Sequence, residues 1–263
     1  MDLQLQDKVV LVAASSGGLG FGIAEAVARE GARVVMGSRS KENIERAADS
    51  IRKSTGAEVR SFPLDVSDSA SISNWVASAI GEFGSIDGLV VNGGGPKPGK
   101  FDDCDDDAWM AGYELTLMSA VRMIRAALPT MRKQQSGSIL VSTSTSVKEP
   151  IDVLLLSNVF RSGVVSLVKS LADDLAGEGI RINNLVPGRI DTERVQTIDQ
   201  LNAKKLGISH EQRRDQEQAL IPIKRYGTAE EYGKAAAFLL SNAAAYITGS
   251  TVTVDGGKSR TVW

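Results

Sequence analysis

The sequence predicts an α/β protein: a doubly wound, mostly parallel sheet with helices on both faces, the Rossmann fold, in one domain over residues 1–263. Short apolar runs rich in β-branched residues recur along the whole chain, and segments with helical spacing separate them. Most runs are nearly continuous in apolar residues, which is typical of strands that helices cover on both faces. No linker, low-complexity tract or internal repeat interrupts this alternation.

Each apolar run is expected to form a strand. The runs are 8–14, 32–38, 58–65, 87–94, 137–144, 181–188 and 251–257. Helices are expected at 22–31, 41–54, 71–84, 107–134 and 156–176. Because parallel strands need long crossover connections, alternating strands and helices favour a parallel sheet.

Residues 192–222 depart from this alternation. The segment is polar, has weak helical character and follows the end of an expected strand. Open α/β sheets bind ligands beyond the carboxyl ends of their strands, so we expect the segment to act as a substrate lid. A surface excursion without a role is the alternative.

Composition and charge indicate an ordinary globular protein. Hydrophobic residues are 42% and charged residues 24% of the chain, and the net charge is −2. This balance gives no electrostatic reason to expect nucleic acid or an anionic membrane surface as a partner. Cys104 is the single cysteine, no apolar run reaches the ~18–20 residues of a membrane span, and the N-terminus does not resemble a signal peptide. A cytoplasmic location is therefore expected.

No metal site is expected. One histidine, His210, and one cysteine are too few for a tetrahedral zinc set. The acidic run DDCDDD at 102–107 lacks the spacing of a calcium loop, and its Asp107 is expected to cap a helix starting at Ala108.

A glycine-rich turn, SSGGLGFG at 15–22, follows the first expected strand and opens the first helix. Glycines in such a turn let the backbone approach a pyrophosphate, which the N-terminus of the helix stabilises. A strand-to-helix turn also tolerates glycine without any ligand, so the place of this turn in the fold carries the prediction. The residues expected to bind the phosphates are Ser15, Ser16, Gly18, Leu19 and Gly20.

Further motifs are spread along the chain. They are LDVSD at 64–68, VNGGG at 91–95, STS at 142–144, NNLVPGRIDT at 183–192 and YITGSTVTVDGG at 246–257. In this order, and at these distances from the glycine turn, they resemble the short-chain dehydrogenase/reductase family over essentially the full length. The pattern is most similar to that of the 3-oxoacyl-acyl-carrier-protein reductases.

The resemblance implies a set of cofactor contacts. They are Asp65 and Val66 with the adenine, Asn92, Gly93 and Gly94 with the cofactor ribose, and Pro187, Gly188, Ile190 and Thr192 with the nicotinamide end. Ala13-Ala14 replaces the family's Thr-Gly, and Val91-Asn92-Gly93-Gly94 replaces Asn-Asn-Ala-Gly, but neither change removes a backbone NH group. Asp65 could instead be a simple turn residue at a strand end.

The end of the second strand indicates which nicotinamide cofactor binds. An acidic residue there would accept hydrogen bonds from the adenosine ribose of NAD, but the sequence has Ser38 and then Arg39. A guanidinium can donate two parallel hydrogen bonds to a 2′-phosphate, so NADP is expected. The alternative is a solvated arginine on a loop.

The catalytic positions depart most from the family. The resemblance implies Ser144 as the residue that polarises the substrate carbonyl, Ser157 in place of the catalytic Tyr, Arg161 in place of Lys, and Glu114 in place of Asn. An aliphatic hydroxyl cannot easily be tuned to a neutral pKa as a phenol can, so Ser157 is a poor general acid. No tyrosine lies between residues 114 and 225 that could replace it.

Other groups could compensate. Arg161 could hold the ribose or an anionic substrate group, although it cannot relay protons as lysine does. Glu114 could pair with Arg161, or act as an acid if burial raises its pKa. Lys148 could point into the cleft and supply a proton, with Lys97 and Lys100 flanking the pocket; each could equally be a surface lysine.

Two main functions follow. The first is an NADP-dependent oxidoreductase for a carbonyl or alcohol substrate, 3-oxoacyl reductase-like, with an atypical acid/base set. The second is a non-enzymatic NADP-binding or regulatory protein. A different reaction in the same pocket is a third possibility.

The resemblance also implies a homotetramer, in which the 107–134 and 156–176 helices pack against symmetry mates. Val164, Leu167 and Leu171 would then be buried between subunits, or could equally face the sheet.

Overall fold

The structure, a computed structural model, describes residues 1–262. The strands are β1 (Val9–Ala13), β2 (Arg33–Ser38), β3 (Val59–Pro63), β4 (Gly88–Val91), β5 (Gly137–Ser142), β6 (Ile180–Pro187) and β7 (Thr251–Val254). The α-helices are α1 (Gly18–Arg29), α2 (Lys41–Thr55), α3 (Ser69–Phe83), α4 (Asp106–Tyr113), α5 (Ser119–Gln134), α6 (Leu155–Ala176), α7 (Glu193–Leu206), α8 (His210–Ala219) and α9 (Ala229–Leu240). Each strand predicted from an apolar run is confirmed, although several end before the run does.

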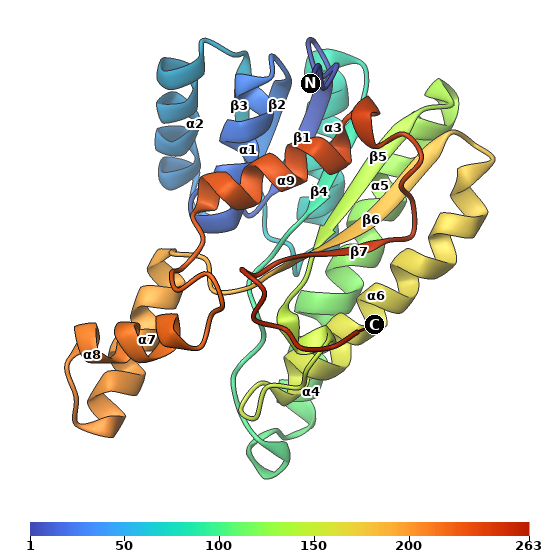
Figure 1. Cartoon of the computed structure of the whole chain (residues 1–263). Coiled ribbons are helices and arrows are strands. Elements are labelled where there is room, and N and C mark those ends of the chain that lie inside the picture. Colours follow the sequence, from blue (N-terminus) through green and yellow to red (C-terminus); the bar gives the residue numbers. More distant parts are fainter. Residues whose placement is uncertain (263) are drawn as a thin grey trace.

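The strands form one seven-stranded sheet in the order β3-β2-β1-β4-β5-β6-β7 (Figure 1). Every pairing is parallel, with Leu11 opposite Leu89 where β1 meets β4. The chain winds outward in opposite directions from these two central strands, so the switch point of the sheet lies between them. In such sheets the ligand crevice lies at this point, beyond the carboxyl ends of the strands. The predicted fold class is confirmed.

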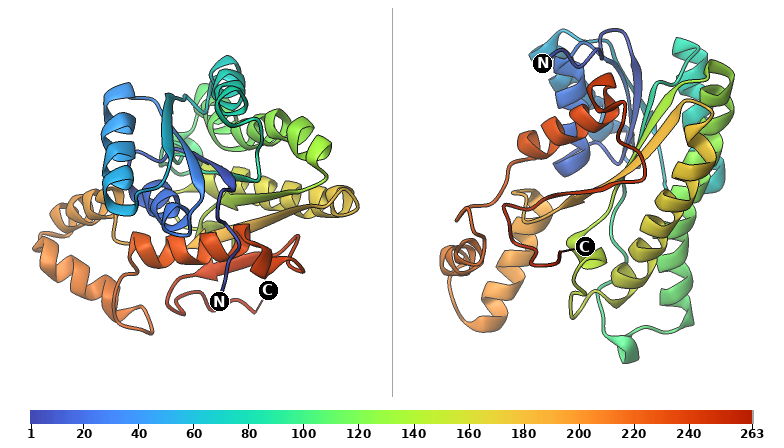
Figure 2. Two further views of the ribbon diagram at one scale, coloured as in Figure 1. Left: turned by 90° about the horizontal axis from the view of Figure 1, so that it is seen from above. Right: turned by 45° about the vertical axis from the view of Figure 1, so that its right-hand side comes forward.

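Helices cover both faces of the sheet (Figure 2). One apolar core packs α1, α2 and α9 against it, and the other packs α3, α5 and α6. This arrangement explains why the central strands have no polar face: β1 is buried at each of its five residues.

Helix α9 was absent from the predicted helices. Its N-terminus has a capping box between Thr228 and Glu231. It crosses α1 at two glycines: a Cβ built on Gly22 would lie 2.3 Å from the carbonyl oxygen of Ala229, and one built on Gly233 would lie 2.2 Å from that of Gly22. The two backbones can approach this closely only because neither residue has a side chain.

The predicted helix 107–134 is interrupted. A π-helical turn, η2 (Glu114–Met118), joins α4 to α5. Asp105, rather than Asp107, caps α4, since its carboxylate accepts a hydrogen bond from Ala108 N at 2.9 Å. The helix begins earlier than expected, and Asp107 lies inside its first turn.

The polar segment 192–222 contains two clear helices, α7 and α8, so the expectation of weak helical character was wrong. Thr192 caps α7, and Ser209 and Gln212 form a capping box on α8. These two helices, called the α7–α8 hairpin below, stand away from the sheet on one side of its carboxyl edge (Figure 1). The sequence of this segment has no continuous apolar stripe, and the ionic cluster described below holds the hairpin in place instead.

Val164 faces the sheet and is 2% exposed, so it is buried within the chain itself rather than available for a subunit interface. Leu167 and Leu171 are partly buried against the same core. Within residues 1–262 no helix combines the length and apolar character needed to span a membrane.

We expect Gly233→Ala to lower the free energy of unfolding by about 1–3 kcal/mol, because the added methyl group would meet the backbone of α1. The control is Gly81→Ala in α3, where a Cβ would have no atom within 4 Å. That variant should be more stable by about 0.5–1 kcal/mol, since alanine favours a helix interior. Urea unfolding of both variants tests the pair; equal destabilisation would contradict the close helix crossing.

Candidate active site

The glycine turn links β1 to α1 at the switch point. Gly18 has a left-handed backbone (φ +57°), and a Cβ on Gly20 would lie 2.4 Å from the carbonyl oxygen of Ala14. Ser15 is fully buried: its Oγ donates to Val12 O (2.8 Å) and accepts from Gly37 N (3.2 Å). The Ser15 side chain therefore ties β1 to β2, while Ser16 is exposed and Leu19 is partly buried at the turn.

Asn92 joins the end of β4 to this turn. Its Nδ2 donates to Ala13 O (3.2 Å) and Ala14 O (3.3 Å). Thr192 is adjacent to the turn as well, because a Cβ built on Gly18 would lie 3.6 Å from the methyl group of Thr192. A Cβ built on Gly93 would lie 3.7 Å from a methyl group of Val66. The ends of β1, β4 and β6 and the segment after β3 therefore meet here.

This meeting point fits a dinucleotide. A Cβ built on Gly17, the residue before α1, would have no neighbouring atom within 4 Å, so the glycine backbone faces open space at the N-terminus of α1. Exposed NH groups at a helix N-terminus are suited to phosphate.

Ser38 ends β2 and Arg39 follows it, as predicted. Ser38 is buried, whereas Arg39 is exposed and has no carboxylate within 4 Å among residues 1–262. Hydrogen bonds from the Ser67 hydroxyl (2.6 Å) and backbone NH (2.9 Å), with a smaller contribution from Arg39, hold the pKa of the Asp65 carboxyl below its usual range. Asp65 therefore acts as a turn residue in this structure, and its role toward adenine stays a prediction.

Residues after β6 have clear packing roles. A Cβ on Gly188 would lie 2.5 Å from Asp255 Cα, and Ile190 packs against Gly227 in an isolated parallel bridge. Pro187 ends β6 opposite Val254. These contacts fix the strand end from which Thr192 starts α7; contacts of Pro187, Gly188 and Ile190 with a cofactor stay predictions.

Ser144 and Ser157 lie on either side of a short turn, η3 (Thr145–Val147). Ser144 Oγ accepts from Ser146 N (3.2 Å), which leaves its own proton free to be donated. Ser157 is only 6% exposed, and its Oγ is 3.5 Å from Ser146 Oγ. The Ser157 hydroxyl is therefore nearly enclosed and lies against η3.

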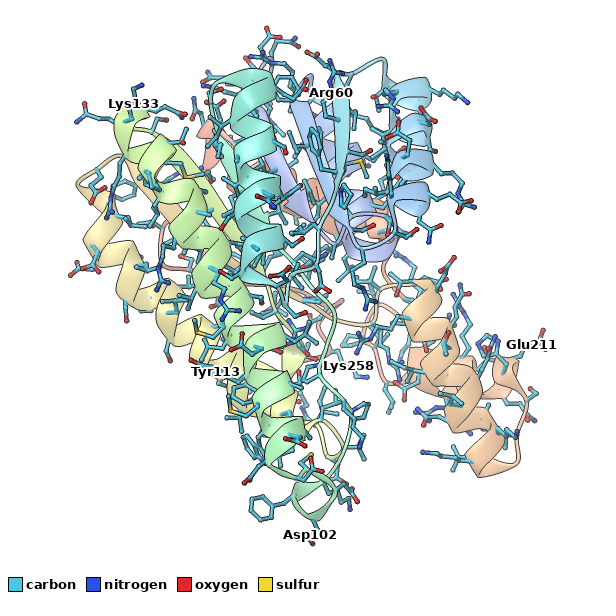
Figure 3. The ribbon with its side chains drawn as sticks, turned by 180° about the vertical axis from the view of Figure 1, so that it is seen from behind. Arg60, Asp102, Tyr113, Lys133, Glu211 and Lys258 are labelled. Atoms are coloured by element: carbon cyan, nitrogen blue, oxygen red, sulfur yellow. The ribbon has the colours of Figure 1, made fainter. Side chains whose placement is uncertain are left out.

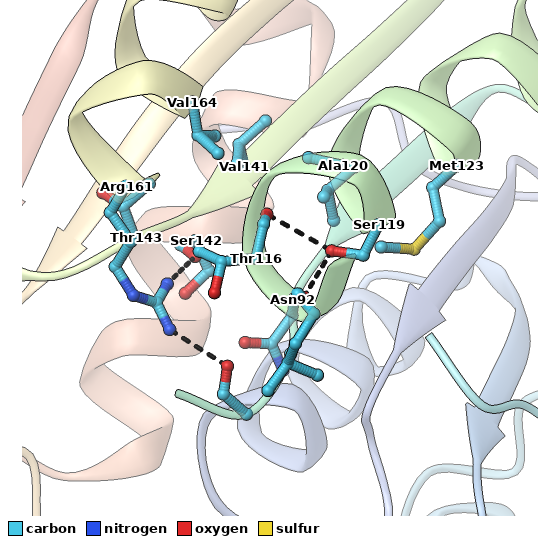
Figure 4. Close-up of a pocket in the computed structure, with 14 residues that line it drawn as sticks. Asn92, Thr116, Ser119, Ala120, Met123, Val141, Ser142, Thr143, Arg161 and Val164 are labelled. Atoms are coloured by element: carbon cyan, nitrogen blue, oxygen red, sulfur yellow. Dashed lines mark hydrogen bonds between the residues drawn. The ribbon is translucent and has the colours of Figure 1, made fainter. Parts of the chain in front are cut away.

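Arg161 lies one helical turn after Ser157 on α6, as predicted, and reaches the ends of β4 and β5 (Figure 4). Its guanidinium donates to Ser142 O and Gly94 O, each at 3.2 Å. Burial, together with the nearby charge of Arg194, lowers the pKa of Arg161 to about 10. No carboxylate within residues 1–262 lies within 4 Å of it.

The predicted ion pair between Glu114 and Arg161 is wrong. Glu114 pairs with Arg122, two turns along the same helical segment. Thr116 lines the small cavity beside Arg161 instead, with Asn92 and Ser119 (Figure 4). This cavity has a volume of about 20 Å³, room for one water molecule.

The direction of each side chain around the helix axis explains why Thr116, and not Glu114, lines the cavity. The side chains of Thr116, Ala120 and Met123 are buried at helical spacing, and Glu114 lies outside that buried stripe. Thr116 is 7% exposed, and its hydroxyl has no hydrogen-bond partner among the described residues. The spacing of the buried residues along this helix could have identified Thr116 from the sequence.

Within the described chain, none of the lysines flanking the site forms a hydrogen bond with Ser144. Lys100 is exposed and 3.9 Å from Asp152. Lys97 is exposed, and Lys148 is partly buried at the end of η3; neither forms an ion pair within the described chain. The role of Lys148 as a proton donor stays a prediction.

A buried ionic cluster holds the α7–α8 hairpin to the end of β6. Arg189 donates to Asp199 (2.9 Å) and Glu217 (3.1 Å), which are 1% and 6% exposed. Tyr226 donates to Asp199 at 2.7 Å, and Lys258 donates to Glu217 at 3.2 Å. In Figure 3, Lys258 is labelled between helix α4 and the hairpin, and Glu211 is labelled at the outer end of the hairpin.

Opposite charges stabilise the acidic members of this cluster. Burial alone would raise the pKa of Glu217, but Arg189, Lys258 and Arg213 outweigh burial, and its pKa is lowered. Sequence reasoning missed this cluster because its members are far apart in the chain.

The parallel sheet, its switch point and a glycine turn after β1 define a nucleotide-binding α/β protein of the Rossmann class. Comparison with known proteins narrows this class. A family model described as Enoyl-(Acyl carrier protein) reductase matches residues 13–259. The chain belongs to the short-chain dehydrogenase/reductase family, as its sequence motifs predicted.

Relatives cover almost the whole chain. Dehydrogenase/reductase SDR family member 4 from Bos taurus is 33% identical over 97% of this chain and 88% of its own length. L-sorbose reductase from Gluconobacter frateurii, solved with NADPH and L-sorbose, has a TM-score of 0.95 at 31% identity and covers 100% of both chains. A variant of actinorhodin polyketide ketoreductase solved with NADPH has a TM-score of 0.92 at 28% identity, over 97% of this chain and 98% of its own.

Arg189→Met should lower the free energy of unfolding by about 3–5 kcal/mol, because it leaves buried carboxylates without their shared cation. Arg225→Met is the control, since it breaks an exposed pair with Glu231 and should cost about 1 kcal/mol or less. Urea unfolding gives both values. Similar small losses for the two variants would contradict a buried ionic anchor.

Proposed function

We propose that the protein is an NADP-dependent oxidoreductase that acts on a carbonyl or alcohol with an atypical acid/base set. The observation that carries this proposal is a crevice with open glycine backbone at the switch point and, after β2, not a carboxylate but Arg39, which forms no ion pair within residues 1–262. The expectation of NADP agrees with the similar reductases that were solved with NADPH. When bound, the cofactor would supply hydride chemistry at its nicotinamide ring.

The chain's own residues can bind and polarise a substrate carbonyl. Ser144 keeps a free hydroxyl proton, and Arg161 adds a positive charge at the ends of β4 and β5. Both would stabilise negative charge that develops on a carbonyl oxygen. Ser157 takes no part in proton transfer here, because its hydroxyl is buried against η3 and is a poor acid.

A non-enzymatic NADP-binding or regulatory protein is the second candidate. The burial of Ser157 favours it, as does the guanidinium of Arg161, which donates to two backbone carbonyls and cannot relay protons. The cofactor site is common to both candidates, and turnover separates them.

Three further features belong to the proposal. The α7–α8 hairpin would serve as the wall or lid over a small-molecule substrate, because it stands beside the crevice from Thr192 onward. By its family, the protein would assemble as a homotetramer. It would work in the cytoplasm, where a lone cysteine stays reduced.

NADPH should bind at least tenfold more tightly than NADH, a difference of about 1.4 kcal/mol or more. Arg39→Ala should remove most of this preference, because it removes the charge-assisted contact to the 2′-phosphate. Arg46→Ala, on the exposed face of α2, is the matched control and should keep it. Titration calorimetry measures the six affinities of the three proteins for the two cofactors; equal affinities in the unmodified protein would make Arg39 a surface residue only.

Reduction of a simple 3-oxoacyl thioester should be slow or absent in the natural protein. Ser157→Tyr with Arg161→Lys should raise it, and adding Thr116→Asn should help further, because Thr116 lines the cavity beside Arg161. Adding Glu114→Asn instead should not help, since Glu114 pairs outside the cavity. NADPH oxidation and melting temperature are recorded together, so that a misfolded variant is recognised.

Fast turnover by the natural protein that survives Arg161→Ala would contradict this assignment. Lys148 would then be the next residue to replace.

A further inference from the structure

The guanidinium groups of Arg161 and Arg194 lie against Gly94 and Gly95, two consecutive residues shortly after β4. Arg161, from α6, donates to Gly94 O at 3.2 Å (Figure 4). Arg194, from the first turn of α7, places its Nη2 2.7 Å from the position that a Cβ on Gly95 would occupy. The missing side chain of Gly95 therefore leaves the space in which Arg194 lies.

Among residues 1–262 neither cation has a counterion, because no carboxylate lies within 4 Å of either guanidinium. The guanidinium of Arg194 also forms no hydrogen bond with the described chain. Other arginines near the crevice differ: Arg122, Arg189 and Arg214 each pair with a carboxylate. The charges of Arg161 and Arg194 are thus left uncompensated at one place.

The two arginines differ in exposure and in how many of their donors are already in use. Arg161 is held by two backbone carbonyls and forms a fixed cation at the base of the crevice. Arg194 is exposed, and its donors are free to form a bidentate contact. It lies in the first turn of α7, at the start of the α7–α8 hairpin that is proposed above as the wall over the substrate.

We infer that Arg161 and Arg194 together bind a carboxylate of the substrate, so that the natural substrate is an oxo acid or a hydroxy acid. This inference rests on the proposed function. The diphosphate of the cofactor is another anion that arginines could bind, but its expected site is the turn before α1, whereas the two guanidinium groups lie against Gly94 and Gly95.

Binding of matched acid and ester probes tests the inference. Pyruvate, acetoacetate and levulinate, each with its methyl ester, place a carboxylate at three distances from a carbonyl. Titration calorimetry on the protein loaded with NADP+, which cannot donate hydride, separates binding from turnover. At least one acid should bind tenfold or more tightly than its ester.

Arg194→Ala should remove this preference, weakening the acid at least tenfold and leaving the ester within twofold. Arg194 is chosen because its exposed side chain makes no contact that folding requires. Lys205→Ala, which removes an exposed positive charge from the other end of α7, should leave both affinities within twofold.

Three outcomes would overturn the inference or its basis. If no acid binds more tightly than its ester, the site does not take an anionic substrate. If Arg194→Ala weakens NADP+ tenfold and leaves the acid-to-ester ratio unchanged, Arg194 serves the cofactor diphosphate. If the unmodified protein fails to bind NADP+ at all, the proposed function fails before this inference is reached.

Discussion

The parallel direction of all seven strands is the constraint on which the rest of the structure depends. Parallel pairing requires helical crossovers, and these bury both faces of the sheet, so polar groups can gather only at the strand ends. The glycine turn, Asn92, Ser144 and Thr192 come from distant parts of the sequence. They meet because β1, β4, β5 and β6 all end at the same edge.

Local pattern was enough to predict the fold. Continuous apolar runs identified the strands, and the motifs at their ends identified the family. Helix α9 was missed because the property that fixes it, backbone contact between Gly22 and Gly233, is a relation between two distant segments. The ionic cluster around Arg189 was missed for the same reason: Asp199, Glu217 and Lys258 look like ordinary surface residues until the chain is folded.

The site was predicted less completely than the fold. Counting along a motif led to Glu114, whereas the buried helical face identifies Thr116, because orientation within a turn decides which side chain reaches the cavity. Ser157 and Arg161 lie on one face of α6 as expected, but they differ in what they reach. The Ser157 hydroxyl is enclosed against η3, whereas the Arg161 guanidinium contacts the end of β5 and the segment after β4. The positive charge is therefore the part of this pair that a ligand can meet.

The ionic anchor of the α7–α8 hairpin also bears on how such a protein can diversify. The contacts that hold the hairpin come from its inner residues, while the turn at Gly207 has open space around it and α8 is largely exposed. Residues in that turn and on the outer surface can be exchanged, inserted or lost without disturbing Arg189 and its partners. The shape of this wall of the crevice can therefore change while the ionic contacts of the hairpin stay the same. New substrates can then be accommodated without changes to the sheet.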